Sequence, residues 1–485
     1  MMNVIFLNSA YNESKIPQRS LGPYLLKHVL KKHNYTSQVI DFCQEFTSTQ
    51  IFEFIKKFTS NETICIGLSS TFWYERVLHG NKGSGIPDNI YDAVKLVKKE
   101  FPNLKIIMGG SRAGYIETML EDIDAIFIGE SEDTLLDVLD HWTKNSAEPD
   151  YEMHEIYNIK VYDKQINKRY DFQYCDFMWT KEDCIVDCET LPIETTRGCV
   201  FRCKFCAYPH LGKKKFDFLK SNDSIRKQLI ENYNNFKITN YIITDDTFND
   251  TEYKIDKFLE MTESLPFKIE FVAYIRADLV HRFPSMADKL QRAGLRCAFF
   301  GIESLHLGAS KLIGKAWSGK HAKVFLPHLL KNIWQGKVYE YCSFIVGLPG
   351  ETKEDLEYTV KWINDNDIKA RFIPLSVIKN AKGKAHSSEF EKNSEEYGFT
   401  FKDDSSEWKN DIWTRSTAFD FDKILNNRLK MQHYGGFNFM SLKSLGYTNE
   451  EIVHKSYYIR DQDFYQRRKN FFDSYITKLM SYSPS

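Results

Sequence analysis

Short runs of apolar residues alternate with amphipathic stretches through the first third of the chain. Five runs have the length and continuity of strands that are buried on both faces: 3–7, 38–42, 64–68, 105–108 and 125–128. Four stretches between them place apolar residues at helical spacing: 20–33, about 50–58, 88–100 and about 132–142. This alternation indicates βαβ units around a parallel sheet. We therefore predict a Rossmann-like, doubly wound α/β domain over residues 1–145.

The pattern changes twice further along the chain. Residues 146–190 are polar and aromatic-rich without a clear period, so we predict a connector there. Six later apolar runs are expected to be strands: 193–197, 240–244, 269–275, 296–302, 340–346 and 371–377. With helical segments between them, residues 191–385 are expected to form a second parallel α/β domain, either an open sheet or an incomplete barrel. Residues 386–485 begin polar and irregular and then become helical in pattern, so this segment is expected to be mostly helical.

Composition and charge narrow the class of protein. The 485 residues are 42% hydrophobic and 27% charged, which excludes wholesale disorder. A net charge of -1 provides no bulk attraction to nucleic acid or to an anionic membrane. No apolar stretch approaches the ~20 residues that cross a bilayer, and the first residues lack the features of a signal peptide. We therefore expect a cytoplasmic protein, in which clustered cysteines bind metal or take part in chemistry.

Three of the 10 cysteines form a tight group, Cys199-Val-Phe-Arg-Cys203-Lys-Phe-Cys206. Soft thiolate ligands at this spacing select zinc or an iron–sulfur cluster. A structural zinc site needs a fourth ligand, for which His210 is the nearby candidate. A cubane cluster held by three cysteines instead leaves one iron open to a small molecule. The position of the group just after a strand, where active-site loops gather, favours the cluster.

The cysteines Cys199, Cys203 and Cys206, with Phe205 before the last of them, resemble the signature of the radical S-adenosylmethionine (SAM) superfamily. This resemblance implies a partial (β/α)6 barrel and a [4Fe–4S] cluster whose open iron binds the methionine moiety of SAM. It further implies reductive cleavage of SAM to a 5′-deoxyadenosyl radical, with the electron coming from a reductant such as flavodoxin or ferredoxin. A zinc- or cluster-binding interaction module without catalysis is the alternative from another class.

Residues at the ends of later strands match the family's SAM contacts in order. The resemblance places Asp245 near the methionine amino group and Arg276 near its carboxylate. It assigns Glu303 and Ser304 to the carboxylate or the ribose, and Gly347 to the adenine. Turns, helix caps and surface ion pairs use the same residue types, so these five assignments depend on their order after the cysteines.

A Rossmann-like domain before such a core resembles the cobalamin-binding class of radical SAM proteins. Small and acidic residues at the ends of its predicted strands match that class: Ser69, Ser70, Gly109, Gly110, Gly129 and Glu130. The resemblance implies cobalamin between the sheet edge and the core, and methyl transfer to an unactivated carbon or phosphorus. The cobalt-binding Asp-x-His-x-x-Gly element is absent after the first strand. A radical SAM isomerase or cyclase without cobalamin is therefore the alternative, in which this domain has lost the cofactor or serves the substrate.

Two questions stay open at the level of sequence. Cys175, Cys184 and Cys188 have the types for a second cluster, but isolated cysteines more often pack as small apolar residues. No motif identifies the substrate, so a small metabolite, a peptide, a lipid and a nucleic acid all remain candidates. The near-neutral charge disfavours the nucleic acid.

Overall fold

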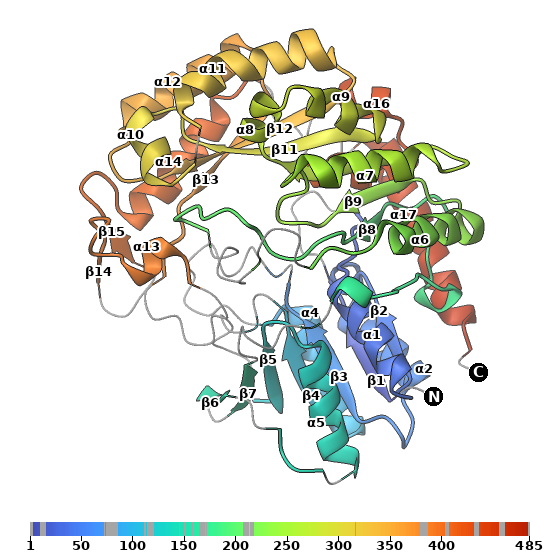
Figure 1. Cartoon of the computed structure of the whole chain (residues 1–485). Helices are drawn as coiled ribbons and strands as arrows, with labels where there is room; N and C mark the ends of the chain where they lie inside the picture. The colour runs from blue at the N-terminus through green and yellow to red at the C-terminus, as the bar shows by residue number, and fades with distance from the viewer. Residues whose placement is uncertain are drawn as a thin grey trace.

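Two large β-sheets organise the chain in the computed structural model (Figure 1). The structure describes residues 3–9, 16–71, 73, 86–110, 113, 121–144, 146–149, 152–156, 159–163, 170, 172–206, 213, 218–315, 317–378, 387–402, 407–430, 436–454 and 461–483. Within these ranges, no helix combines the length and the apolar character that a membrane crossing requires.

The first sheet contains seven strands in the order β2-β1-β3-β4-β5-β7-β6. Five of them correspond to the apolar runs of the sequence and pair in parallel: β1 (Val4–Leu7), β2 (Ser37–Ile40), β3 (Cys65–Ser69), β4 (Lys105–Gly109) and β5 (Ala125–Ile128). The five predicted strands are therefore confirmed. Because neighbouring strands run in the same direction, their carboxyl ends meet at one edge of the sheet.

Helices cover both faces of this sheet, which explains the continuous apolar runs. On one face, α1 (Gly22–Lys32) and α5 (Glu132–Lys144) share a core with Val4 and Phe6. On the other face, α2 (Ser48–Phe58) and α4 (Asp88–Glu100) pack on the alternate residues of the same strand. The strand β1 thus buries successive side chains in two different cores.

The segment predicted as a connector contributes two strands to the first sheet. They are β6 (Glu152–Ile156) and β7 (Ile159–Asp163), which pair antiparallel, while β7 also pairs in parallel with β5. Since β6 is an edge strand, it does not need apolar residues on both faces, and it contains Glu, Met, His, Glu and Ile. A prediction based on runs of apolar residues therefore missed these two strands, because β6 is too polar to form such a run.

The second sheet has six strands that follow one another in chain order and pair in parallel. They are β8 (Leu191–Ile193), β9 (Asn240–Ile243), β10 (Glu270–Ile275), β11 (Leu295–Glu303), β12 (Tyr339–Val346) and β13 (Ala370–Pro374). Five of the six predicted strands are present at the predicted positions, whereas the strand predicted at 193–197 ends at Ile193 and shares only that residue with the prediction. The main helices between them are α6 (Asn222–Phe236), α7 (Glu252–Glu263), α8 (Ala277–Arg282), α9 (Ser285–Arg292), α10 (Leu307–Leu312), α11 (Gly319–His328) and α12 (Lys353–Asp365).

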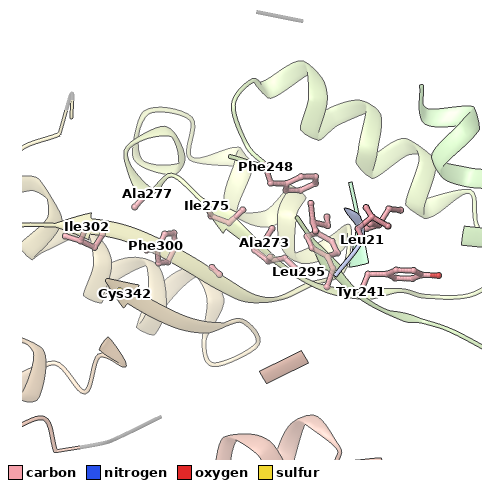
Figure 2. Close-up of a cluster of buried hydrophobic side chains, with 14 of the residues drawn as sticks. Leu21, Tyr241, Phe248, Ala273, Ile275, Ala277, Leu295, Phe300, Ile302 and Cys342 are labelled. Carbon is pink, nitrogen blue, oxygen red and sulfur yellow. The ribbon is translucent and has the colours of Figure 1, made fainter. Parts of the chain in front are cut away.

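Alternate side chains of the second sheet face the helices that cover it. Figure 2 shows Ala273 and Ile275 of β10 near Phe300 and Ile302 of β11 in one apolar cluster that also includes Phe248. The intervening positions face the opposite side of the sheet, where the C-terminal helix α15 (Gly436–Lys443) packs on β9 to β12. The second sheet is therefore covered by helices on one side and by α15 on part of the other.

The C-terminal part of the chain reaches both sheets (Figure 1). Its elements are α13 (Glu389–Lys392), β14 (Thr400–Phe401), β15 (Trp408–Lys409), α14 (Arg415–Asn427), α15, α16 (Asn449–His454) and α17 (Gln462–Ser481). The helix α14 packs on β12 and β13. At the other end of the molecule, Tyr475 of α17 contacts Phe42, which follows β2. The mostly helical character predicted for this segment is thus observed.

A buried ionic group fixes the first sheet to the strand that opens the second. The side chain of Arg19 lies 2.5 Å from a carboxylate oxygen of Asp41, at the end of β2, and 2.6 Å from one of Glu189, just before β8. The backbone N–H of Asp41 donates to the hydroxyl of Tyr475 at 2.7 Å. All four side chains are buried, so removal of one partner would leave an uncompensated buried group.

Candidate active site

The three cysteines of the motif lie on the loop that follows β8, and each is partly exposed. A turn closes the end of the motif, since the N–H of Cys206 donates to the carbonyl of Cys203 at 3.0 Å. Phe205, between them, packs against the main apolar core. Backbone bonds hold the loop from both sides: the N–H of Lys204 donates to Ile313 beyond α10, and its carbonyl accepts from Phe390 of α13.

Polar groups of the neighbouring strand ends lie close to the sulfur atoms of Cys199 and Cys203. The Sγ of Cys199 lies 3.3 Å from the hydroxyl of Thr247, which follows β9. The Nη1 of Arg276, which follows β10, lies 3.6 Å from the Sγ of Cys203. Burial raises the pKa of the Cys199 thiol, while the Thr247 hydroxyl lowers it. A metal that binds this sulfur would therefore also have to displace its proton.

The donor set of this loop fits a multi-iron cluster. In the part of the chain that the structure describes, no three His, Cys, Asp or Glu side chains are arranged to hold a single metal ion. A [4Fe–4S] cluster makes a different demand, because each cysteine binds a different iron and the sulfurs are spread more widely. The loop supplies three partly exposed thiols, which are the donor type that holds such clusters. His210, the alternative zinc ligand, lies outside the described residues.

Asp245 binds protein groups at the start of the cysteine loop, and the SAM contact assigned to it stays a prediction. Its carboxylate is 1% exposed and accepts hydrogen bonds from the N–H groups of Thr195 and Thr196 at 2.7 and 3.0 Å. The ammonium of Lys254 binds the other oxygen at 2.8 Å. Asp245 therefore anchors the chain that leads from β8 to Cys199. Its neighbour Asp246 is more exposed, and burial together with Asp245 raises the pKa of Asp246 to about 7.

Arg276 lies beside the cysteine loop, as its predicted role requires. Its Nε and Nη2 bind the two carboxylate oxygens of Asp278 at 3.0 and 2.7 Å. The buried side chain of Asn249 bonds to both the N–H and the carbonyl of Arg276, which fixes its backbone. The guanidinium also lies 3.8 Å from the ring centre of Phe201. Arg276 is thus held in place with Nη1 directed at Cys203.

Glu303 and Ser304 lie at the end of β11 and are both buried. Glu303 has a φ of +68° and binds the ammonium of Lys315 at 3.0 Å. The hydroxyl of Ser304 donates to the carboxyl group of Glu351 at 2.5 Å. Burial raises the pKa of Glu351 to about 8, and its Oε2 has no hydrogen-bond partner among the described residues. Glu351 was not predicted from the sequence, although it follows the glycine segment after β12.

Packing against the C-terminal segment explains why residue 347 is a glycine. Its φ is +105°, and a Cβ there would lie 2.7 Å from the ring of Trp408 and 3.2 Å from the Cβ of Ala418. The amide of Asn410 donates to the carbonyl of Gly347 at 3.0 Å. The C-terminal segment therefore lies directly on the turn after β12. The adenine contact assigned to Gly347 stays a prediction.

A cavity of about 350 Å³ lies at the carboxyl edge of the first sheet. Its lining includes five of the six residues assigned there from the sequence: Ser69, Gly109, Gly110, Gly129 and Glu130. Ser70, the sixth, is buried, and both its N–H and its hydroxyl bond to the carbonyl of Gly109. The opposite wall is formed by Glu194, Arg197 and Thr244 of the second sheet. The cavity thus reaches the loop that carries the cysteines.

Arg197 is the main residue of this region that the sequence motifs did not identify. It lies two residues before Cys199, and its side chain binds Glu132 of α5 at 2.7 Å and Glu194 at 2.8 Å. The spacing Glu194-x-x-Arg197 before the first cysteine could have predicted the ion pair between these two residues, but not the contact with Glu132. The contact across to α5 depends on how the two sheets meet.

The chain is similar in sequence and in structure to known methyltransferases. A curated relative named as an uncharacterized methyltransferase of Pyrococcus horikoshii is 25% identical over 366 residues, which cover 71% of this chain and 72% of the relative. The methyltransferase TsrM from Kitasatospora setae, solved with cobalamin and a [4Fe–4S] cluster, has a similar structure, with a TM-score of 0.59 and 13% identity. That match covers 78% of this chain and 76% of TsrM.

A second structural neighbour spans nearly the whole chain. The cobalamin-dependent SAM radical enzyme OxsB, solved with aqua-cobalamin and SAM, covers 99% of this chain and 80% of its own, at a TM-score of 0.61 and 16% identity. At such low identities these likenesses establish the fold. The family model of the Radical SAM superfamily matches residues 193–363, which contain all three motif cysteines. The chain therefore contains a Radical SAM superfamily domain that runs from the end of β8 to α12.

Proposed function

We propose that this protein is a radical SAM enzyme that uses cobalamin to transfer a methyl group to an unactivated carbon or phosphorus. The observation that carries the proposal is the cavity at the edge of the first sheet, whose lining includes Glu194 and Arg197 at the start of the loop with the cysteines. A cofactor in that cavity would face the cluster loop directly. The methyltransferase names of the relatives and the cobalamin in the structural neighbours support the same function.

The cluster loop has the residues to hold a [4Fe–4S] cluster and SAM. Cys199, Cys203 and Cys206 would bind three irons, and the cluster would supply the electron that cleaves the sulfonium of SAM. Arg276 donates to Cys203 and places a positive charge beside that sulfur. Asp245 fixes the start of the loop. We assign the remaining SAM contacts as the resemblance implies: Phe205, Glu303, Ser304 and Gly347.

The cavity wall has the small residues that let a large planar cofactor approach the backbone. Gly109, Gly110 and Gly129 have no side chains beyond the strand ends, and Ser69 has a short one. The floor includes Phe6, Leu25 and Phe127, which are apolar. Cobalamin bound there would supply the methyl carrier, while these residues orient it and exclude water.

The test is anaerobic reconstitution with iron and sulfide, followed by three measurements on the same sample. We expect about four irons and four sulfides per chain, formation of 5′-deoxyadenosine from SAM with a reductant, and binding of hydroxocobalamin. Flavodoxin or ferredoxin would be the reductant in the cell. One zinc per chain would contradict the enzyme and support the interaction module. A cluster and SAM cleavage without cobalamin binding would support the isomerase or cyclase.

Matched cysteine variants sharpen this test. Cys203→Ala is expected to lose the cluster and all cleavage of SAM, because the sulfur of Cys203 is an assigned ligand. Cys188→Ala removes an exposed cysteine outside the motif and is expected to keep both. If Cys203→Ala retains cleavage, the ligand assignment is wrong. If Cys188→Ala loses iron, a second cluster is present.

A further inference from the structure

Arg197 lies at the junction between the cavity and the cysteine loop. Its side chain is only 11% exposed and has three carboxylates around it. Glu194 belongs to the same loop, at 2.8 Å, whereas Glu132 at 2.7 Å and Glu130 at 4.0 Å belong to the turn and helix after β5. One guanidinium therefore joins the first sheet to the loop that holds Cys199.

Aromatic side chains fix the same guanidinium from its faces. It lies 4.8 Å from the ring centre of Phe172 and 5.8 Å from that of Tyr170. The N–H of Tyr170 also donates to Glu130 at 3.2 Å. Since a planar guanidinium that is stacked and paired with carboxylates has few alternative rotamers, Arg197 transmits a displacement of one partner to the other.

The charge balance of this wall indicates which ligand groups it suits. Three carboxylates face one guanidinium, and all four residues line the cavity: Glu130, Glu132, Glu194 and Arg197. These carboxylates bring hydrogen-bond acceptors to the cavity, beside the donors of Arg197 and of the hydroxyl residues that also line it. A ligand that carries amide N–H groups at its periphery, as cobalamin does in its side chains, complements such acceptors. This step rests on the proposed function.

We propose that Arg197 is a positioning residue that couples occupation of the cavity by cobalamin to the placement of the cysteine loop. A ligand that engages Glu130 and Glu132 changes the acceptors of Arg197, and Cys199 follows Arg197 by two residues. By linkage, the cluster must then change the affinity for cobalamin by the same factor as cobalamin changes the affinity for the cluster. The measurable prediction is this coupling factor, the ratio of the dissociation constants for cobalamin with and without the cluster.

The test is titration of the protein with hydroxocobalamin, followed by its absorption spectrum, with and without the reconstituted cluster. In the wild type we expect the dissociation constants to differ by about fivefold or more. In Arg197→Met the two constants are expected to become equal. Arg292→Met is the matched control, because Arg292 also pairs with two carboxylates but lies on the exposed surface of α9. This control is expected to keep the wild-type factor.

A second variant separates coupling from simple loss of structure. Glu132→Gln changes only the first-sheet side, removes the negative charge that pairs with Arg197, and is expected to lose the coupling as Arg197→Met does. If Arg197→Met fails to fold, Glu132→Gln still tests the proposal. If the wild type does not bind hydroxocobalamin, the proposed function fails together with this inference. If the wild type binds it with the same affinity in both forms, or if both variants keep the factor, only the inference fails.

Discussion

The contact between Gly347 and Trp408 gives a stability prediction with an internal control. Alanine at Gly347 would combine the strain of a φ of +105° with a Cβ 2.7 Å from the Trp408 ring, at a cost of about 3 kcal/mol. Gly350, in the same turn, has a φ of +77°, but no atom lies within 4 Å of the point that a Cβ would occupy. Gly350→Ala is therefore expected to cost about 1 kcal/mol, from backbone strain alone.

Urea unfolding of both variants measures this difference, and limited proteolysis locates it. Because Trp408 lies on the turn after β12, Gly347→Ala is expected to expose the chain around β15 to protease earlier than Gly350→Ala does. Equal losses of stability in the two variants, within about 0.5 kcal/mol, would refute the packing of Trp408 on this glycine. The comparison also bears on SAM binding, since displacement of the C-terminal segment would uncover the turn assigned to the adenine.

Three further predictions concern charged groups of the site. Because burial raises the pKa of Glu351 to about 8, the wild type is expected to lose roughly 3 kcal/mol of stability relative to Glu351→Gln as the pH rises from 5 to 8, which urea midpoints at several pH values would measure. A constant difference across that range would contradict it. Asp245→Asn removes the nearer of the two carboxylates that pair with Lys254 and leaves Asp250 at 3.9 Å, so it is expected to cost about 3 kcal/mol and to lower the iron content, measured by unfolding and iron analysis. Arg276→Met removes the donor to Cys203 and is expected to make the reduction potential of the cluster more negative in a redox titration, whereas an unchanged potential would exclude the contact.

The strands could be predicted from the sequence because most of them are buried on two faces. Val4 and Ile5 enter different cores, so every position of β1 had to be apolar, and the run was visible. The pair β6–β7 is different: β6 is an edge strand, and β7, although it lies between β5 and β6, has the exposed Lys160 among its buried residues. The mixed composition of this pair therefore resembled that of a connector. As a result, the sequence predicted only five of the seven strands of the first sheet.

Within the site, the sequence predicted where the functional side chains lie better than it predicted which groups they contact. Arg276 follows a strand that neighbours β9 and β11, so its proximity to the cysteine loop followed from the parallel topology. The direction in which a carboxylate points depends on which donors surround it. Asp245 turns toward Thr195 and Lys254, and nothing in the motif around Asp245 identifies either partner.

The relation between the two sheets depends on residues that are far apart in the chain. Arg19 joins Asp41 to Glu189, and Arg197 joins Glu132 to the cysteine loop. Each arginine therefore links the first sheet to a segment next to β8, one just before the strand and one just after it. The first is fully buried and has all its charge compensated inside the protein, so it sets a fixed geometry. The second lines the cavity together with Glu130, Glu132 and Glu194, so we infer that a ligand bound there changes its environment and, through it, the position of Cys199.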